Sequence, residues 1–350
     1  MSLYDQFADR TFTVESVTRR RHLANTTSGF ERATTEIRLG GEGVVGRGED
    51  VTYETDDHYA FADQDLDDFD LEGEWTISAF SDHLDDLDLF ATKEPEQAAS
   101  RNYRQWAFES AALDLSLRQA EESLSEAVGV EPSPLRFVVS TRLGDPPSAD
   151  RVKSLLETDP NLEFKLDPTP DWPDDLFVTL RETEAVRVVD LKGWYKGTDV
   201  DVPADAELYR DVLAAFPSAV VEDAAFTPTT RPLLEPQADR LAFDYPVSSV
   251  ETLEDLPVEP GWCNVKPSRF GSLEALCDTV DYCRAHGIDM YAGGQFELGP
   301  GRRQVQALAA LWFPDAPNDI APGVFNDPAE SPPYPDSPLR PSRKVVGFDF

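Results

Sequence analysis

The segment "GWCNVKPSRFGSLEALCDTVDYCRAHGIDMYAGG", residues 261–294, contains one strand–helix–strand repeat and indicates the fold class. Residues 262–268 read as a short apolar strand, residues 272–287 as an amphipathic helix, and a second apolar strand begins at residue 288. Such a repeat forms two parallel strands joined by a right-handed crossover. Lys266 stands where the first strand ends, so its amine is either solvated or directed at a ligand.

The same alternation runs along the chain from about residue 135. Seven apolar strands are predicted at 135–141, 162–168, 186–193, 219–224, 241–247, 262–268 and 288–297. Polar helices are predicted between them at 148–159, 172–183, 205–217, 250–256 and 272–287. So dense an alternation favours a closed (β/α) barrel over an open sheet, and such barrels carry their active site at the carboxyl ends of the strands.

The N-terminal part of the chain has a different character. Residues 11–55 show the β-branched, alternating pattern of half-buried strands, and residues 101–128 predict an amphipathic helix or a helix pair. Residues 41–46, "GEGVVG", fit the glycine pattern of nucleotide-binding loops. No helix follows them to bind a pyrophosphate, so we interpret them as tight turns of a sheet.

The composition excludes several classes of partner. A net charge of −36, from 67 acidic and 31 basic residues, repels nucleic acid and anionic membranes. The acids are spread along the chain, which suggests adaptation to high salt. Three cysteines lack the spacing of a zinc site and are interpreted as buried apolar residues. No apolar run is long enough to span a membrane and no signal peptide is evident, so we expect a cytoplasmic protein.

Ionisable side chains follow the apolar strands where each one ends. The set comprises Lys165, Asp167, Asp190, Glu222, Asp244, Lys266, Gln295 and Glu297, of which Gln295 alone is uncharged. Buried charges must be paired or coordinated, and closing a barrel brings the carboxyl ends of its strands to one mouth. Carboxylates that meet there would repel each other unless a divalent cation lay between them. Hard oxygen ligands suit Mg²⁺, with Mn²⁺ as the alternative.

This series resembles the enolase superfamily, in its muconate-lactonizing and o-succinylbenzoate synthase branch. "VVDLKG", "VVEDA" and "AFDYP" look like the three metal-ligand strand ends, "NVKPSRFGS" like the strand with a catalytic lysine, and "GGQFELGPGRRQVQALAAL" like the seventh strand and its helix. The resemblance implies an α/β fold, a (β/α)7β TIM-type barrel at 129–315. An N-terminal α+β capping domain at 1–128 would be completed by the tail, 316–350. It also implies that Asp190, Glu222 and Asp244 bind Mg²⁺ and that Lys266 is catalytic.

Two departures from the family pattern concern the second and third strands. The second strand usually carries two lysines one residue apart, whereas this chain has Glu163, Lys165 and Asp167. Lys165 is therefore either the second, catalytic lysine, which we favour, or the first, with Asp167 in place of the second. Lys192 stands where Asn is common, so it could pair with Glu222 or with the substrate.

Other assignments follow from strand alternation and from the family. Asp223 competes with Glu222 as a ligand, but successive side chains of a strand face opposite sides, so Asp223 is predicted to point outward. Glu297 is either catalytic or a structural partner of Lys266. Substrate contacts are expected from Glu297, Gln295, Lys192 and Asp167, and from one of the arginines at 19–21 unless these lie in a solvated turn.

The resemblance implies Mg²⁺-dependent removal of a proton α to a carboxylate, giving a metal-stabilised enolate that undergoes elimination, cycloisomerisation or epimerisation. A lysine base alone supplies about 10²–10⁴-fold, so the ion must supply much of the remaining stabilisation. The partner is then a small carboxylate substrate, and a homo-oligomer is left open. Two alternatives remain: a barrel glycosidase with paired carboxylates, or a binding protein that has kept the fold without activity.

Overall fold

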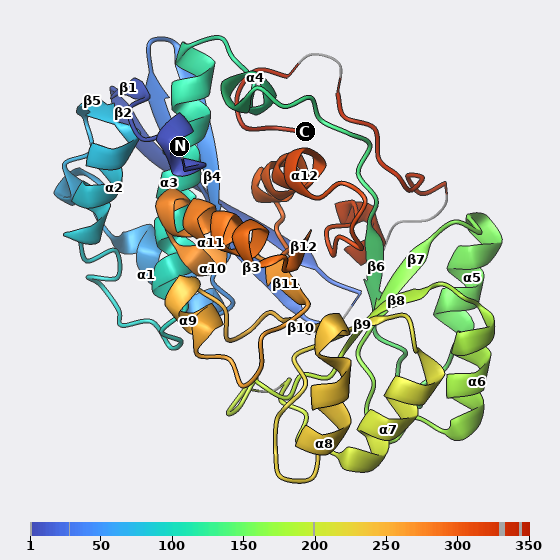
Figure 1. Ribbon diagram of the computed structural model, residues 1–350. Helices are drawn as coiled ribbons and strands as arrows, with labels where there is room; N and C mark the ends of the chain where they lie inside the picture. Colours follow the sequence, from blue (N-terminus) through green and yellow to red (C-terminus); the bar gives the residue numbers. More distant parts are fainter. Residues whose placement is uncertain (1, 28, 199, 329–332, 343–344) are drawn as a thin grey trace.

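The computed structural model describes residues 2–27, 29–198, 200–328, 333–342 and 345–350 (Figure 1). An N-terminal α+β part is followed by a curled sheet of seven parallel strands with helices around it. This confirms the predicted fold class. No helix in these ranges is both long and apolar enough to cross a membrane.

The N-terminal part contains two small antiparallel sheets and four α-helices. The strands are β1 (Thr11–Val14), β2 (Ser16–Asn25), β3 (Glu31–Gly41), β4 (Val44–Asp50) and β5 (Gly73–Thr76), and the helices are α1 (Thr55–Asp63), α2 (Ile77–Asp85), α3 (Ser100–Gln119) and α4 (Leu124–Val128). Strand β3 pairs with both β2 and β4, and β1 pairs with β5. Helices α1 and α2 were not predicted from the sequence, whereas the helix pair at 101–128 is confirmed as α3 and α4.

The glycine-rich segment at 41–46 makes the hairpin between β3 and β4. Glu42 and Gly43 both have positive φ, +52° and +79°, as a two-residue turn of type I′ requires. Gly46 and Gly48 then let α3 approach β4 closely. A Cβ on these residues would lie 2.3 Å from the Ala111 carbonyl oxygen and 2.0 Å from that of Ala107, respectively. The interpretation as sheet turns is confirmed.

All seven predicted barrel strands are present. They are β6 (Val138–Thr141), β7 (Glu163–Leu166), β8 (Val186–Asp190), β9 (Val220–Glu222), β10 (Leu241–Phe243), β11 (Trp262–Val265) and β12 (Asp289–Ala292), hydrogen-bonded in chain order. Asn318 forms a parallel bridge to Phe137 beside β6, and Asp319 forms one to Gly293 beside β12. The residues just after the last helix thus connect the two edges of the sheet and close the barrel.

The helices around the sheet match the predicted ones with two exceptions, the short α10 (Pro267–Phe270), which begins within the predicted strand 262–268, and the segment between β9 and β10. The helices are α5 (Asp150–Thr158), α6 (Asp174–Glu182), α7 (Ala206–Ala215), α9 (Val250–Glu254), α10, α11 (Leu273–His286) and α12 (Gly301–Trp312). No helix was predicted between β9 and β10, where the structure has a short α8 (Arg231–Leu234) and a 3₁₀ turn at Glu235–Arg240. The sequence did not predict these two elements, because each has a proline at its start and neither has an apolar stripe.

The C-terminal tail contacts both parts of the molecule. Leu339 pairs with Leu135 next to the barrel, and the Phe348 amide donates to Asp114 on α3. Residues 329–332 and 343–344 of the predicted tail lie outside the described residues. The three cysteines are buried and free, as expected.

Candidate metal centre

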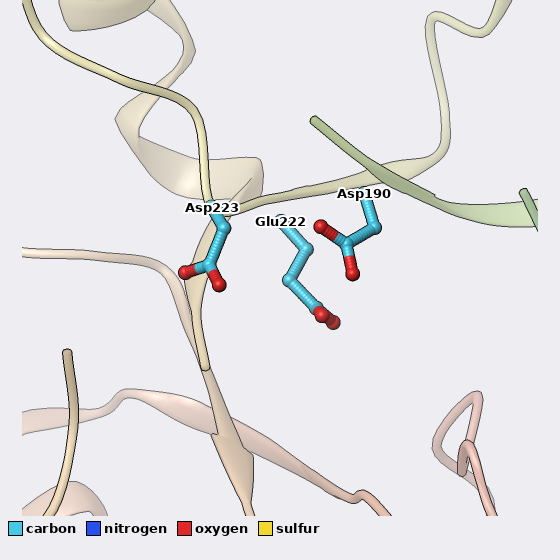
Figure 2. Close-up of side chains that lie close together, drawn as sticks. All are labelled: Asp190, Glu222 and Asp223. Atoms are coloured by element: carbon cyan, nitrogen blue, oxygen red, sulfur yellow. The ribbon is translucent and has the colours of Figure 1, made fainter. Parts of the chain in front are cut away.

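Three carboxylates meet at the carboxyl ends of two neighbouring strands. Asp190 ends β8 and Glu222 ends β9, where the two residues are register partners, and Asp223 follows directly. All three are fully buried. Oxygen atoms of the three side chains lie within 4.8 Å of one another, and Figure 2 shows the carboxylates side by side. We call Asp190, Glu222 and Asp223 the acid triad.

The position of Asp223 corrects the prediction that it points outward. Strand β9 ends at Glu222, and Asp223 has a φ of +51°, so the alternation of a regular strand no longer applies to it. Its carboxylate accepts hydrogen bonds from the amides of Asp244 (2.9 Å) and Tyr245 (3.0 Å). The left-handed backbone therefore turns a third acid into the barrel mouth.

Asp244 is buried at the end of β10, but its oxygens are already occupied. It accepts from Lys266 Nζ at 2.8 Å, from Arg269 Nε at 3.1 Å and from the Tyr195 hydroxyl at 2.9 Å. Burial alone would raise the pKa of Asp244, but Arg269 and Lys266 outweigh it and hold the pKa well below its usual range. Within the described ranges, the acids close enough to share one ion are those of the acid triad, without Asp244.

Lys165 lies against the acid triad from strand β7. Its Nζ is 2.5 Å from Glu222 Oε1, 3.3 Å from Asp190 Oδ2 and 3.0 Å from Asp319 Oδ2. Burial would lower the pKa of this amine, but these carboxylates, Asp319 most strongly, raise it well above its ordinary value. Asp319 was missed by the sequence reasoning because it follows no recognisable strand.

Lys192 is the second lysine in contact with the acid triad, and it also pairs with Asp167. Lys192 Nζ forms a short ion pair with Asp190 and lies 3.8 Å from Asp167 Oδ1. Its short ion pair is therefore with Asp190 and not with Glu222, and its contact with a substrate stays a prediction. Glu163 is elsewhere, because both of its oxygens are held by Arg136 and Arg187. On the second strand, only Lys165 and Asp167 thus reach the site.

Burial acts to raise the pKa of all three acids of the triad, but the neighbouring charges make their final pKa values differ. Burial, and then Asp190 and Asp244, raise the pKa of Glu222 well above its ordinary value despite the opposing effect of Lys165. Burial, Asp244 and Asp190 raise the pKa of Asp223 to about 7. The pKa of Asp190 is instead held well below its usual range, because Lys192 and Lys165 outweigh the effect of burial. The raised pKa values of Glu222 and Asp223 indicate that Lys165 and Lys192 do not offset the charge of three ionised carboxylates.

Gln295 and Glu297 follow β12 and line the other side of the mouth. Gln295 donates through Nε2 to the Ser268 hydroxyl at 2.5 Å, and its backbone amide donates to Glu297 at 2.6 Å. Glu297 lies 3.6 Å from Arg302, while the ion pair of Lys266 is with Asp244. Glu297 is thus not the structural partner of Lys266 in this structure.

Two further contacts reach Glu222 from strands β11 and β12. The Asn264 side chain donates to Glu222 at 3.1 Å, and the Tyr291 hydroxyl makes a short hydrogen bond to the same carboxylate. Tyr291 was missed by the sequence reasoning. Its position within an apolar strand, two residues before Gly293, was the signal that could have identified it.

Several buried acceptor atoms in the mouth have no hydrogen-bond partner among the described residues. They include Asp167 Oδ1, Asn264 Oδ1 and Gln295 Oε1. Buried polar atoms are almost always satisfied in native proteins, by protein or by water. Three orphaned acceptors around an acid triad are what a site built to receive a cation or a polar ligand would display.

The N-terminal part contributes side chains to the edge of the mouth. Arg32 donates to the Gln295 carbonyl at 3.1 Å and stacks under the Tyr53 ring, with its guanidinium carbon 4.5 Å from the ring centroid. The arginines at 19–21 lie in strand β2 rather than in a turn. Of these, Arg19 donates to the backbone carbonyls of Ala62 and Gln64.

Comparison with known proteins supports the fold seen here. Residues 5–127 match the family described as "Domain of unknown function (DUF8230) N-terminal domain", and residues 131–327 match the corresponding C-terminal domain. An N-succinylamino acid racemase from Amycolatopsis sp is 27% identical over 225 residues, 62% of this chain and 58% of that protein. An o-succinylbenzoate synthase from Bacillus subtilis (strain 168) is 39% identical over 67 residues, 18% of each chain. The chain thus spans less than two thirds of the length of these relatives.

Solved structures match over most of the chain. A member of the enolase superfamily from Listeria innocua Clip11262 is 18% identical, with a TM-score of 0.65, covering 91% of this chain and 88% of that one. The muconate lactonizing enzyme from Pseudomonas putida is 18% identical, with a TM-score of 0.63 and 88% of each chain covered. These structures share the fold of this chain, including that of the enolase-superfamily member. The family models cover most of the sequence, so the chain belongs to the DUF8230 family.

Proposed function

We propose that this protein is a Mg²⁺-dependent enzyme that removes a proton α to the carboxylate of a small substrate. Elimination, cycloisomerisation or epimerisation then follows. The observation that carries this proposal is the acid triad, fully buried at the strand ends and bordered by Lys165, with Lys266 across the mouth on Asp244.

The donor set of the mouth fits a hard divalent cation. Asp190 and Glu222 would hold it, with Asp244 as the third ligand implied by the family and Asp223 as the third ligand favoured by proximity. A bound cation would act as a Lewis acid that offsets the negative charge developing on the substrate carboxylate. Mg²⁺ suits carboxylate oxygens, and Mn²⁺ accepts the same ligands.

Lys266 is the residue proposed to exchange a proton with the substrate carbon. Its pKa is raised, because Asp244 outweighs the lowering effect of burial. In this arrangement Lys266 is protonated and acts as the acid that returns a proton. To act as the base it must be neutral, which requires that Asp244 be engaged elsewhere when the substrate binds.

Lys165 is proposed as the second catalytic lysine, on the opposite side of the mouth. The alternative is that Asp167 takes the place of this lysine, because its side chain is 20% exposed whereas that of Lys165 is 2% exposed. Lys192, whose side chain is 16% exposed, is proposed to contact the substrate. Gln295 and Glu297 are proposed to contact the substrate from the β12 side. Two amines on opposite sides of one carbon would allow one to remove a proton and the other to return it.

A binding protein without activity is the second candidate. The observation that favours it is that Lys165 and Lys192 already form ion pairs with Asp190, so part of the acid charge is offset by the protein itself. Such a protein would bind a cation or an anionic ligand without proton transfer. A glycosidase is not favoured, because it leaves the buried lysines without a role.

The proposal is tested by following α-proton exchange with D₂O. N-acyl amino acids, dipeptides and acid sugars are incubated with the protein and Mg²⁺, and deuterium incorporation is measured by NMR. We expect exchange with at least one class, and its loss in Lys266→Ala. Lys153→Ala, which removes an exposed lysine on α5, is the matched control and should exchange normally. No exchange in any class, with Mg²⁺ bound, would leave the binding protein as the explanation.

A further inference from the structure

Asp319 lies in the segment that closes the barrel, between the two edges of the sheet. Its amide donates to the Ala292 carbonyl at 2.8 Å, and its carbonyl accepts from the Gly294 amide at 3.0 Å. The backbone of Asp319 is therefore fixed to the residues after β12. Its side chain is 14% exposed and reaches into the mouth.

The carboxylate of Asp319 meets the amine of Lys165 at 3.0 Å. The same amine contacts Glu222 and Asp190, two members of the acid triad. Among the ion pairs that the structure describes for Lys165, the one with Asp319 is the only one outside the triad. Asp319 itself does not share the triad's cluster of oxygens. Lys165 thus lies between the acid triad, which fits a cation, and Asp319, which is not part of that cluster.

A cation held by Asp190 and Glu222 creates a conflict for Lys165. The ammonium group would lie next to a double positive charge in a buried site, where like charges repel strongly. At the same time, the acids that now pair with Lys165 would be engaged by the ion. Lys165 can remain at the mouth only if another anion holds it, and Asp319 is placed to do so.

We propose that Asp319 is a positioning residue: it holds Lys165 aside when Asp190 and Glu222 turn to a divalent cation, so that the site accommodates both. The inference rests on the proposed Mg²⁺ site. Without Asp319, the amine would stay on Glu222 and Asp190 and compete with the cation for them. Asp319 would therefore favour cation binding through Lys165, without being a ligand.

The test is a double-mutant cycle with cation affinity as the readout. Mg²⁺ affinity is measured by calorimetry, and Mn²⁺ affinity by the loss of the free-ion EPR signal, for wild type, Asp319→Asn, Lys165→Met and the double variant. We expect Asp319→Asn to weaken binding at least fivefold, and Asp319→Glu to restore part of the loss. In the Lys165→Met background, Asp319→Asn should change the affinity less than twofold.

Asp315→Asn is the matched control, since it removes an exposed acid from the same segment and should leave the affinity unchanged. Circular dichroism establishes that each variant is folded, and Asp319→Glu keeps the test valid if Asp319→Asn is not. Equal affinities of wild type and Asp319→Asn would overturn the proposal. An equal loss in both backgrounds would also overturn it, because Asp319 would then act on the ion directly. If wild type binds neither Mg²⁺ nor Mn²⁺, the proposed function itself fails.

Discussion

Two buried clusters of charge, one in the N-terminal part and one at the barrel mouth, are built differently. In the first, Asp50 accepts from Arg104 Nε at 2.8 Å and from Thr52 through its other oxygen. The two terminal nitrogens of Arg104 donate to the carbonyls of Leu89 and Asp57. Its guanidinium also packs against the rings of Phe61 and Phe90. Each nitrogen of the Arg104 guanidinium and each oxygen of Asp50 thus makes at least one hydrogen bond.

The barrel mouth has more acids than such pairs can satisfy. Glu222 and Asp223 keep a raised pKa although Lys165 is in contact with the triad, and acceptor atoms of Asp167, Asn264 and Gln295 lack hydrogen-bond partners. A complete polar network fixes a structure, whereas an incomplete one leaves atoms available to a ligand. The first cluster is thus satisfied within the protein, whereas the second keeps acceptor atoms available to a ligand, as the proposed function requires.

The largest expected effect is on activity at the barrel mouth. Lys266→Met should reduce α-proton exchange by about 10²–10⁴-fold, the usual contribution of a general acid or base. Asp244 keeps Arg269 and Tyr195 as partners, so the free energy of unfolding should change by less than about 1 kcal/mol. Exchange measured by NMR and urea denaturation separate the two effects. A large loss of stability with exchange intact would make the mouth another structural cluster.

Arg104→Met should show the opposite behaviour. It leaves Asp50 buried without its cation, and removing one partner of a buried pair costs about 3–5 kcal/mol. Urea denaturation measures this loss. Arg101→Met, three residues earlier on the same helix, removes an arginine that is 45% exposed and should change stability by less than about 0.5 kcal/mol. If both variants behave alike, the cluster around Asp50 does not stabilise the fold as argued.

Glu109 on α3 is a third kind of buried acid, one without a cation. Burial raises its pKa to about 8, and it accepts from Ser81 and from the Leu273 amide at the start of α11. Because the pKa is higher in the folded than in the unfolded state, the contribution to stability is full below about pH 4 and is lost as the pH rises through about 8.

Between pH 5 and pH 8, wild type should therefore lose at least about 2 kcal/mol of unfolding free energy relative to Glu109→Gln, at about 1.4 kcal/mol per pKa unit. Urea titrations of both proteins across this range measure the difference. Parallel curves would show that Glu109 ionises in the folded state as it does in water.

The acidic surface should respond to salt with a smaller effect. With a net charge of −36, repulsion between exposed acids weakens as the Debye length falls from about 10 Å at 0.1 M to about 3 Å at 1 M salt. We expect the unfolding free energy to rise by about 1 kcal/mol with NaCl over this range. A constant or falling value would remove the argument for adaptation to salt. The buried acids of the mouth should instead respond to Mg²⁺ at far lower concentration.

The sequence predicted the barrel and the strand ends because apolar strands that end in charged residues leave a strong pattern. Asp190, Glu222, Asp244 and Lys266 could be identified in this way, and the structure places all four at one mouth. Whether they bind the ion and the substrate stays a prediction. The short α8 could not be identified, because its proline-containing sequence lacks an amphipathic stripe.

The details of the site depended on backbone geometry that no local pattern contains. Asp223 turns inward because of its left-handed φ, which the rule of strand alternation could not foresee. Asp319 reaches Lys165 because a segment without strand-like sequence closes the barrel. Both contacts arise where regular structure ends, and there periodicity carries no information.

The most direct test of the account is a calorimetric titration of Mg²⁺ into wild type and Glu222→Gln. Glu222 is the member of the acid triad that contacts Lys165, Asn264 and Tyr291, so its charge is central to the site. We expect one Mg²⁺ per chain in wild type and no measurable binding in the variant. An absence of binding in wild type, or an unchanged affinity in Glu222→Gln, would contradict it.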